Sequence, residues 1–431
     1  MTRKALSLCR FCGEPLKYTF ADLGVQPLCE TYLQPEQLAK MEPFYPLHVF
    51  VCEKCLLVQQ GDTISPETIF SQYAYFSSHS KGWLKHSEDY AGMIVTKLAL
   101  NQKSQVIEVA SNDGYLLQFF AQRNIPVLGI EPAANVAEEA ARKGIPTLVR
   151  FFDCKTANEL VNQNKKADLL IGNNIIAQVP NLNDFVAGLK ELLKPSGIIT
   201  IEFHHLLNLM NNSQFDTISH ERYSHFSFIV IEKVFTKHGL TIFNVEELPT
   251  HGGSLRIYAR HSENNSIPIT ANLEEIRNKE RKAKLPDLEQ YVAFAEKVKA
   301  AKRNILCFMI KAKRNRKTIV GYGAHAEAHT LLNYCGVGPD FLDYTVDRNP
   351  IKQGKFIAGI RIPIFHPNKI FETKPDYVLI LPWNIKKEIM AQMSKIGDWD
   401  GQFVVPIPRI MLFNSDGNEI GDNYLTKEET K

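Results

Sequence analysis

Two short cysteine pairs near the start of the chain restrict its N-terminal fold more than any other sequence feature. Cys9 and Cys12 bracket one knuckle, and Cys52 and Cys55 bracket a second. Four thiolates on two such knuckles fill the tetrahedral coordination of Zn²⁺ and leave no open position. The spacing therefore predicts a closed, structural zinc site in a ribbon-like module. The alternative, disulfides or free thiols, is disfavoured because the N-terminus lacks the long apolar stretch of a secretory signal.

Length and charge set broad limits. A chain of 431 residues is too long for one compact core, so several domains are expected. The net charge of +3 is too weak to indicate nucleic acid or an anionic membrane surface as a partner. No apolar run approaches the roughly 20 residues that span a bilayer. We expect a cytoplasmic protein with no nucleic-acid or membrane partner, whose oligomeric state the sequence does not reveal and for which a monomer is plausible.

Strands and helices alternate over two parts of the chain. In the first part, strands are predicted at 106–110, 127–131, 167–172 and 198–203, and helices at 81–100, 115–123, 135–143 and 182–193. Such alternation is typical of a parallel sheet with helices on both faces. In the second part, strands are predicted at 318–324, 342–347 and 377–381. The charged stretch between them, 273–316, is broken at Pro286 and predicts two amphipathic helices.

The turn after the strand at 106–110 has the features of a cofactor site. It contains Asn112 and Asp113 and opens a helix, at the sheet edge where α/β proteins bind ligands. It lacks the G-x-G-x-x-G pattern that holds a pyrophosphate, and suits a cofactor with a sulfonium and an amino-acid end. Glu131 closes the next strand, where it could accept hydrogen bonds from ribose hydroxyls. Both S-adenosylmethionine and NAD enzymes have this arrangement, and a solvated strand end is the alternative for Glu131.

Two further groups of polar residues stand out. Asn173 and Asn174 end the strand at 167–172, where they could contact a cofactor or cap a turn. The segment 215–225 holds a dense set of ionisable side chains. A histidine and a glutamate in such a set are suited to moving a proton near neutral pH. The alternative for this segment is an exposed polar loop.

The chain resembles the nucleotide-sugar C-methyltransferases of deoxysugar biosynthesis over nearly its whole length. The motifs that carry the resemblance follow the family's order: the two cysteine pairs, YAYFSS at 73–78, EVASNDG at 108–114, GIEP at 129–132, FDTI at 215–218, HGGSLR at 251–256, GYGA at 321–324, LLNY at 331–334 and VDRNP at 346–350.

The resemblance implies an α/β fold in four parts: a zinc-binding module at 1–72, a class I methyltransferase Rossmann-like domain at 73–265, a helical connector at 266–317 and a C-terminal Rossmann-like substrate domain at 318–431. It also implies S-adenosylmethionine and structural Zn²⁺ as cofactors. The implied substrate is a nucleotide-linked 4-keto-6-deoxy sugar. A base would remove its C3 proton, and the resulting enolate would attack the methyl group while polar donors stabilise the C4 oxygen.

Carried onto this sequence, the resemblance implies four sets of site residues. They are catalytic His220, Glu221, Arg222, His225 and Tyr75; cofactor-binding Glu108, Ala110, Asn112, Asp113, Glu131, Pro132 and Asn173; substrate-binding Tyr73, Tyr223, Arg256, Tyr322, Asp347 and Arg348; and metal-binding Cys9, Cys12, Cys52 and Cys55. Three alternatives stay open. Tyr73 and Tyr75 could pack in a core, Arg256 could pair with an internal carboxylate, and the region of Asp347 could bind NAD.

The chain departs from the family at two places. The family's Tyr-His-Glu-His is Ser219-His220-Glu221-Arg222 here, and arginine cannot act as a base. The base would then be His225, His220 or Glu221, with Arg222 as an enolate or phosphate partner. After Gly321–Ala324, Glu327 stands where the family has a lysine. Three hypotheses follow: an active sugar methyltransferase with a relocated base, a methyltransferase of another acceptor, or a catalytically degenerate homologue that binds a ligand or partner.

Overall fold

The chain folds into two compact units, neither of which is continuous in sequence. The computed structural model describes residues 7–61, 64–70, 73 and 75–421. The first unit combines the N-terminal stretch up to Tyr18 with Val51–Leu207 and Glu221–Leu288. The second combines Thr19–Phe50, Asn208–His220 and the stretch from Glu289 onward. The four-part domain division inferred from the sequence stays a prediction.

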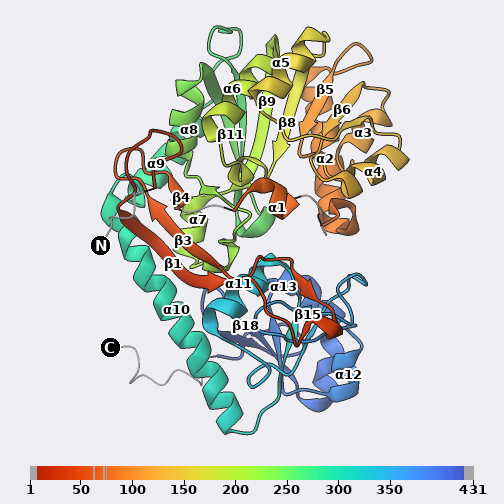
Figure 1. The fold of residues 1–431 in the computed structure, drawn as a ribbon, viewed down its shortest axis with the longest axis vertical. Helices are drawn as coiled ribbons and strands as arrows, with labels where there is room; N and C mark the ends of the chain where they lie inside the picture. Colours follow the sequence, from red (N-terminus) through yellow and green to blue (C-terminus); the bar gives the residue numbers. More distant parts are fainter. Residues whose placement is uncertain (1–6, 62–63, 71–72, 74, 422–431) are drawn as a thin grey trace. The chain divides into compact units, whose positions relative to one another are not determined.

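The main sheet of the first unit is mixed (Figure 1). Its strand order is β11-β12-β9-β8-β5-β6-β7. The strands are β5 Val106–Val109, β6 Val127–Ile130, β7 Thr147–Leu148, β8 Ala167–Asn173, β9 Leu193–His204, β11 Leu240–Leu248 and β12 Ser254–His261. Strands β5 to β9 run parallel, whereas β12 and β11 continue the sheet antiparallel. The predicted parallel strands are confirmed, but the prediction missed the β11–β12 hairpin.

Helices flank this sheet because each buries one apolar stripe. They are α1 Pro66–Phe70, α2 Lys81–Leu98, α3 Leu117–Ala121, α4 Ala134–Arg142, α5 Cys154–Asn162, α6 Leu182–Leu192, α8 Phe228–Lys237 and α9 Asn272–Lys282. In α2, the side chain of Ser80 accepts the Trp83 N–H and caps the helix. Tyr90 and Ile94, four residues apart, then face one core with Phe120 and strand residues of the sheet.

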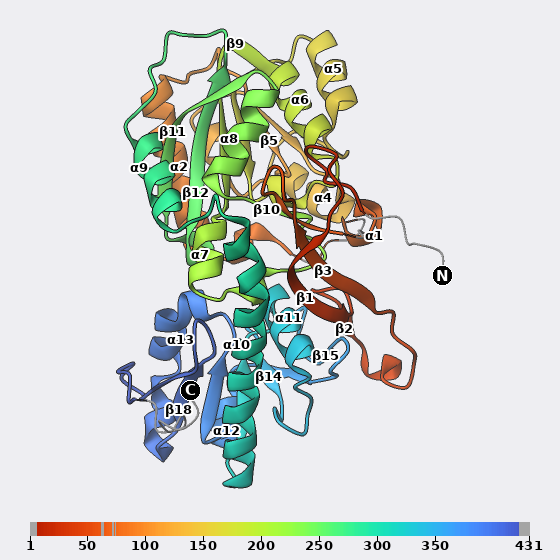
Figure 2. The same ribbon diagram turned by 90° about the vertical axis from the view of Figure 1, so that its left-hand side faces the viewer.

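The second unit holds another parallel sheet and the longest helix of the described chain (Figure 2). The strand order is β16-β14-β13-β17-β18-β19. The strands are β13 Ile319–Tyr322, β14 Thr345–Val346, β16 Ile364–Phe365, β17 Tyr377–Ile380, β18 Gln402–Val405 and β19 Met411–Phe413, and the helices are α10 Leu288–Arg314, α11 Ala326–Cys335, α12 Lys369–Thr373 and α13 Lys386–Gln392. Only β19 runs antiparallel to its neighbour.

Short strands complete both units. In the first, β4 Val58–Gln60 pairs with β10 Ser224–His225. In the second, β1 Tyr18–Gln26 lies beside β3 Tyr45–Val51, and β2 Tyr32–Leu33 pairs with β15 Phe356–Ile357.

Two predictions about the second half of the chain fared differently. The charged stretch does form two helices, α9 and α10, separated around Pro286 as predicted. The strand predicted at 342–347 is only Thr345–Val346, because the preceding residues belong to the loop in which Leu342 N–H bonds to Gly338 O.

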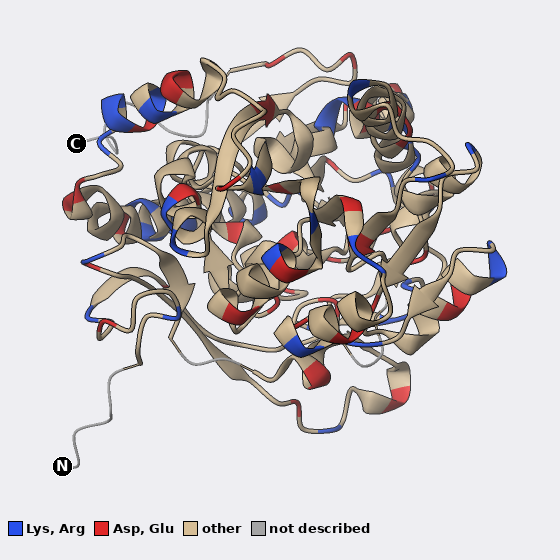
Figure 3. Cartoon of the chain, turned by 90° about the horizontal axis from the view of Figure 1, so that it is seen from above, with Lys and Arg blue, Asp and Glu red and all other residues tan. Residues whose placement is uncertain are grey.

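The distribution of charge and the length of the helices relate to binding of nucleic acid and insertion into a membrane. Figure 3 shows Lys and Arg residues interspersed with Asp and Glu along the chain. Among the residues described, no helix combines the length and apolarity that crossing a bilayer requires.

The packing of α2 generates a stability prediction. Ile94 is fully buried in its core, so Ile94→Ala should lower the free energy of unfolding by about 2–5 kcal/mol. Glu88→Ala, on the exposed face of the same helix, should change it little. Urea denaturation followed by circular dichroism measures both, and equal effects of the two substitutions would contradict the packing described here.

Candidate functional site

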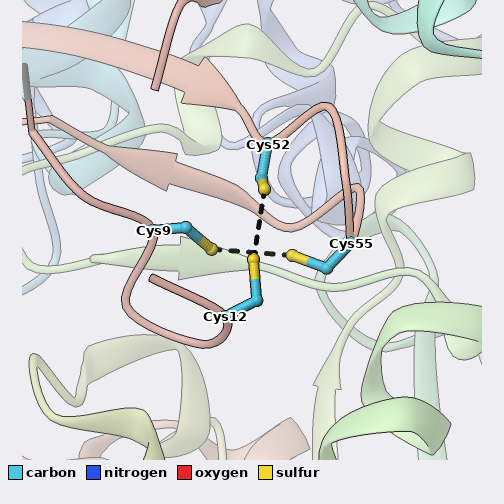
Figure 4. Close-up of side chains that lie close together, drawn as sticks. All are labelled: Cys9, Cys12, Cys52 and Cys55. Atoms are coloured by element: carbon cyan, nitrogen blue, oxygen red, sulfur yellow. Dashed lines mark hydrogen bonds between the residues drawn. The ribbon is translucent and has the colours of Figure 1, made fainter. Parts of the chain in front are cut away.

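The four predicted metal ligands converge on one point (Figure 4). Their Sγ atoms all lie within 4.8 Å of one another, and the Cys9–Cys55 and Cys12–Cys52 separations are both 3.5 Å. Sulfurs bound 2.3 Å from a tetrahedral zinc stand about 3.8 Å apart. Disulfide sulfurs would stand at about 2.05 Å. The donor set and spacing therefore fit a zinc ion, and the four cysteines form a zinc-binding centre.

Local backbone geometry builds both knuckles. Gly13 N–H bonds to Cys9 O at 2.8 Å, and Leu56 N–H bonds to Cys52 O at 2.9 Å. Each turn closes on a residue with positive φ, 77° at Gly13 and 66° at Leu56. Glycine adopts this conformation freely, whereas leucine is strained in it. The second knuckle therefore needs more stabilisation from neighbouring contacts than the first, because they must hold Leu56 in a strained conformation.

The turn after β5 is shaped by three left-handed residues. Ala110, Asn112 and Gly114 have φ values of 57°, 48° and 74°. Ser111 then lies directly against Gly129 of β6, where a Cβ atom would be 2.3 Å from the Ser111 hydroxyl. Glycine at 129 is therefore required for the turn to fold over the neighbouring strand.

Glu131 holds this turn from the end of β6. Its Oε2 accepts Asn112 N–H and its Oε1 accepts Ala133 N–H, both at 2.9 Å. The side chain is buried, so a solvated strand end was the wrong alternative. Burial raises the pKa of Glu131 to about 7. Each carboxylate oxygen keeps a second lone pair, which a ribose hydroxyl could use.

The first residue of the motif, Glu108, is completely buried in β5. The buried Tyr115 lies beside it, and its hydroxyl can donate to the Glu108 carboxyl. Burial raises the pKa of Glu108 well above its usual value. The cofactor-binding role of Glu108 stays a prediction. Ala110 and Pro132, also predicted to bind the cofactor, are half-buried at the same turns.

Asp113 is committed to an ion pair. Lys143 Nζ lies 3.0 Å from its Oδ2, and the Ser78 hydroxyl donates to the same oxygen. Asn173, the last residue of β8, pairs in register with Glu202 of β9 and is half-buried. The cofactor-binding roles of both residues stay predictions.

The segment around Tyr73 and Tyr75 runs across the turns that follow β5 and β6. Asn112 clamps it from one turn, since its amide donates to Tyr75 O at 3.1 Å and accepts Ser77 N–H at 2.8 Å. Asn135, at the start of α4, clamps it from the other. The Asn135 amide donates to Tyr73 O at 2.8 Å and accepts Tyr73 N–H at 3.2 Å.

This segment reaches the predicted catalytic stretch. The Tyr73 hydroxyl donates to Glu221 Oε2 at 3.2 Å, and the rings of Tyr73 and Tyr75 lie 6.2 Å apart. These contacts therefore connect Glu221 to the turn after β5 through Tyr73, Tyr75 and Asn112. Asn135 was missed from the sequence, because one asparagine near a helix start carries no recognisable signal.

The remaining residues of the stretch differ in their surroundings. Tyr223 is fully buried, and its hydroxyl donates to Ile64 O at 2.8 Å. Burial, with the charges of Arg222 and Arg10, lowers the pKa of His225 to about 3. The His225 ring is therefore neutral at pH 7.

His220 falls in the second unit, at its boundary with the first. Its ring Nε2 lies 3.3 Å from Tyr45 O, to which it can donate, and burial lowers its pKa. An exposed polar loop is the wrong alternative for the stretch from His220 to His225, because no residue in it is exposed.

Arg256 sits in a buried charge cluster on β12. Its Nη2 donates to Glu202 Oε2 at 2.9 Å, and its guanidinium lies 4.4 Å from the centre of the Tyr90 ring. Burial alone would raise the pKa of Glu202, but the His86 hydrogen bond and the Arg256 charge lower it to about 2. Pairing with an internal carboxylate, the alternative kept for Arg256, is thus observed, and its substrate role stays a prediction. His86 of α2, whose Nε2 lies 2.9 Å from Glu202 Oε2, is half-buried in this cluster.

The predicted substrate residues of the second unit lie at the carboxyl ends of β13 and β14. The Tyr322 hydroxyl donates to Gln392 at 2.8 Å. Asp347 accepts Ala324 N–H at 2.9 Å and Asn349 N–H at 2.8 Å. Arg348 is exposed and pairs with Glu388 at 2.9 Å. Their roles toward a substrate stay predictions.

Comparison with known proteins now adds to this geometry. Three family models match: a zinc binding domain over residues 9–70, a methyltransferase domain over 83–245 and a C-methyltransferase C-terminal domain over 249–408. The C-methyltransferase NovU of Streptomyces niveus is 31% identical over 413 residues, which are 95% of this chain and 97% of that protein. This chain belongs to the C-methyltransferase family.

Solved methyltransferase structures match the C-methyltransferase only in part. Magnesium protoporphyrin IX methyltransferase from Synechocystis, with bound S-adenosylmethionine, is 15% identical, with a TM-score of 0.31. The match covers 41% of this chain and 79% of that one. An S-adenosylmethionine-dependent methyltransferase from Clostridium acetobutylicum is 13% identical, with a TM-score of 0.34 and coverage of 41% and 92%.

The zinc centre of this C-methyltransferase generates one prediction. Metal analysis of the purified protein should give about one zinc per chain, because four thiolates complete one tetrahedral site. Cys55→Ser should lower that content and destabilise the protein, whereas Cys154→Ser should leave zinc unchanged because Cys154 lies outside the cluster. A folded protein without metal would contradict the assignment.

Glu131 generates a second prediction. Glu131→Gln should weaken S-adenosylmethionine binding at least about tenfold, the usual loss for a charge-assisted hydrogen bond. With a pKa of about 7, the wild-type carboxyl ionises as pH rises, so its affinity should increase from pH 6 to pH 8. Isothermal calorimetry measures both effects.

The control for this experiment is Glu138→Gln, on the exposed side of α4. It should bind the cofactor like the wild type at both pH values. A wild-type affinity that falls between pH 6 and pH 8 would count against the ribose role of Glu131.

Proposed function

We propose that this S-adenosylmethionine-dependent C-methyltransferase acts on a nucleotide-linked 4-keto-6-deoxy sugar and methylates C3 through an enolate. The observation that carries the proposal is the contact between Tyr73 and Glu221, beside the cofactor turn. It joins a carboxylate and a phenol, both buried or half-buried, at the sheet edge where the methyl donor is expected.

Glu221 is the base that the surroundings favour. His225 lies in β10, where it pairs with Val58 of β4, and its ring is buried. His220 has its Nε2 directed to the Tyr45 carbonyl. Glu221 instead holds a hydrogen bond from Tyr73. We infer that Glu221 removes the C3 proton and that Tyr73 orients its carboxylate.

Arg222 would stabilise the negative charge that develops on the substrate. S-adenosylmethionine supplies an electrophilic methyl group when it is bound, and the C3 carbanion is stabilised as an enolate on the C4 oxygen. A permanently charged guanidinium can stabilise that oxygen or a substrate phosphate. The Arg222 carbonyl is fixed by Gln60 Nε2 at 2.9 Å, which holds the backbone while the side chain is half-buried.

A different acceptor is the second candidate. Glu327 occupies the first turn of α11, where a helix N-terminus would otherwise favour an anion. It pairs with His325 at 3.3 Å. A carboxylate there disfavours a phosphate, so a methyl acceptor without a diphosphate is the alternative substrate class.

Product analysis distinguishes these functions. The protein would be incubated with S-adenosylmethionine and dTDP- or GDP-4-keto-6-deoxyhexoses, and the products followed by mass spectrometry. A gain of one methyl group supports the proposal and identifies the nucleotide. Cofactor binding without sugar methylation favours another acceptor. Absence of cofactor binding would identify a degenerate homologue.

The assignment of Glu221 can be tested by substitution. Glu221→Gln should lower kcat by about 100-fold or more, in the range that general-base removal costs, while S-adenosylmethionine affinity stays unchanged. Glu67→Gln, an exposed glutamate of α1, is the matched control and should keep full activity. Full activity of Glu221→Gln would transfer the role of base to another residue.

Arg222 gives an independent prediction. If Arg222 binds the enolate oxygen, Arg222→His should lower kcat by about 10²–10³-fold, as loss of an oxyanion donor does. A rise in turnover would instead mean that arginine replaced a working base. Steady-state methylation assays at saturating cofactor separate the two results.

A further inference from the structure

One side chain connects the zinc centre with the proposed catalytic stretch. Arg10 lies between the zinc ligands Cys9 and Cys12. Its Nη1 donates to the Tyr223 carbonyl, and its Nη2 donates to the Gln60 carbonyl at 3.3 Å. The guanidinium carbon also lies 5.8 Å from the centre of the Tyr223 ring.

The backbone of Arg10 is fixed independently of these contacts. Its N–H bonds to Gln59 Oε1 at 2.8 Å, while Gln59 Nε2 donates to the zinc ligand Cys9 at 3.1 Å. Its carbonyl accepts Asn183 Nδ2 at 3.1 Å, from helix α6. The zinc knuckle and helix α6 therefore fix the backbone position of Arg10. The hydrogen bonds of its guanidinium then fix the orientation of the side chain.

The stretch that Arg10 contacts is held at residues 222–225 by the neighbouring strand β4. In the β4–β10 pair, Ser224 is opposite Gln59 and His225 is opposite Val58. Gln60 N–H bonds to Tyr223 O at 3.0 Å, and Gln60 Nε2 donates to Arg222 O at 2.9 Å. The Tyr223 carbonyl thus accepts two donors, one of them charged. Charge-assisted hydrogen bonds are the stronger and more directional kind.

We propose that Arg10 is a positioning residue for methyl transfer, through which the zinc-bound knuckle fixes the backbone that carries Glu221 and Arg222. The role of zinc would then extend from folding the N-terminal module to orienting the acceptor side of the site. The inference rests on the proposed function insofar as Glu221 and Arg222 serve the reaction. A displacement of about 1 Å at a reacting group can cost about 10²-fold in rate, so modest loosening of this backbone should be measurable.

The second knuckle supplies a matched control. Glu53, between Cys52 and Cys55, pairs with Lys17 at 2.6 Å, and both side chains are partly exposed. Lys17→Met removes a cation that pairs with a zinc knuckle but that is not seen to contact residues 221–225. Arg10→Met removes the cation and keeps an apolar stem. Arg10→Lys keeps the charge without the two-pronged geometry.

The experiment compares these variants in the full-length protein loaded with zinc. Metal analysis gives zinc content, calorimetry gives S-adenosylmethionine affinity, steady-state assays give kcat and KM, and hydrogen exchange reports on the peptide spanning 221–227. For Arg10→Met we expect wild-type zinc and cofactor affinity, faster exchange in that peptide, and kcat reduced about 30-fold or more with KM for the cofactor unchanged. Arg10→Lys should recover part of the lost kcat, and Lys17→Met should match the wild type.

Two outcomes would overturn the proposal. One is wild-type exchange and kcat in Arg10→Met. The other is loss of zinc in that variant, which would make Arg10 a part of the metal module alone. If Arg10→Met does not fold, Arg10→Gln tests the same point, because it removes the charged donor to Tyr223 O, keeps a polar side chain and should also raise exchange in the 221–227 peptide. If the wild type methylates no sugar nucleotide, the proposed function fails, while hydrogen exchange still decides whether Arg10 orders the stretch.

Discussion

The convergence of four sulfurs is the constraint on which much of the first unit depends. The two cysteine pairs are separated by about forty residues of chain, most of which belong to the other unit. Closing that loop costs conformational entropy, and metal ligation offsets it. Once closed, the centre places Arg10, Gln59 and Gln60 beside residues 222–225. The zinc-bound segment thereby contacts the stretch that we propose to be catalytic.

In contrast to the zinc centre, the turns after β5 and β6 are held by hydrogen bonds between backbone groups and buried side chains. Glu131 gathers the turns after β5 and β6 by accepting an N–H from each. Asn112 and Asn135 then use their amides as paired donors and acceptors to hold the tyrosine segment. These amide clamps are neutral, so they add no charge near the buried carboxyls of Glu108 and Glu131.

The sequence predicted those features that are encoded by residues close together in the chain. The cysteine spacing identified the zinc centre, and the strand-turn-helix pattern located the turn after β5 that Glu131 holds, whose cofactor role stays a prediction. Strand lengths in the second unit and the β11–β12 hairpin were less accessible, because antiparallel additions leave no alternation with helices. Arg10, Asn135 and the pair Glu202–Arg256 were invisible as partners, since their contacts join residues between 54 and 213 positions apart. The substitution at Arg222 was visible at once, but the neutral state of His225 follows only from its burial.

The interleaving of the two units has a consequence for how the protein is made. Thr19–Phe50 leaves the ribosome early, yet most of its unit lies after Glu289. The first unit likewise needs Glu221–Leu288 to supply β11 and β12 before its sheet is complete. The early segments therefore cannot complete their packing until the late segments have been synthesised. Contacts between residues so far apart in sequence also form slowly. Strands β1 and β3 can pair with each other soon after synthesis, but the rest of their unit follows only after Glu289, so this unit should complete its folding late.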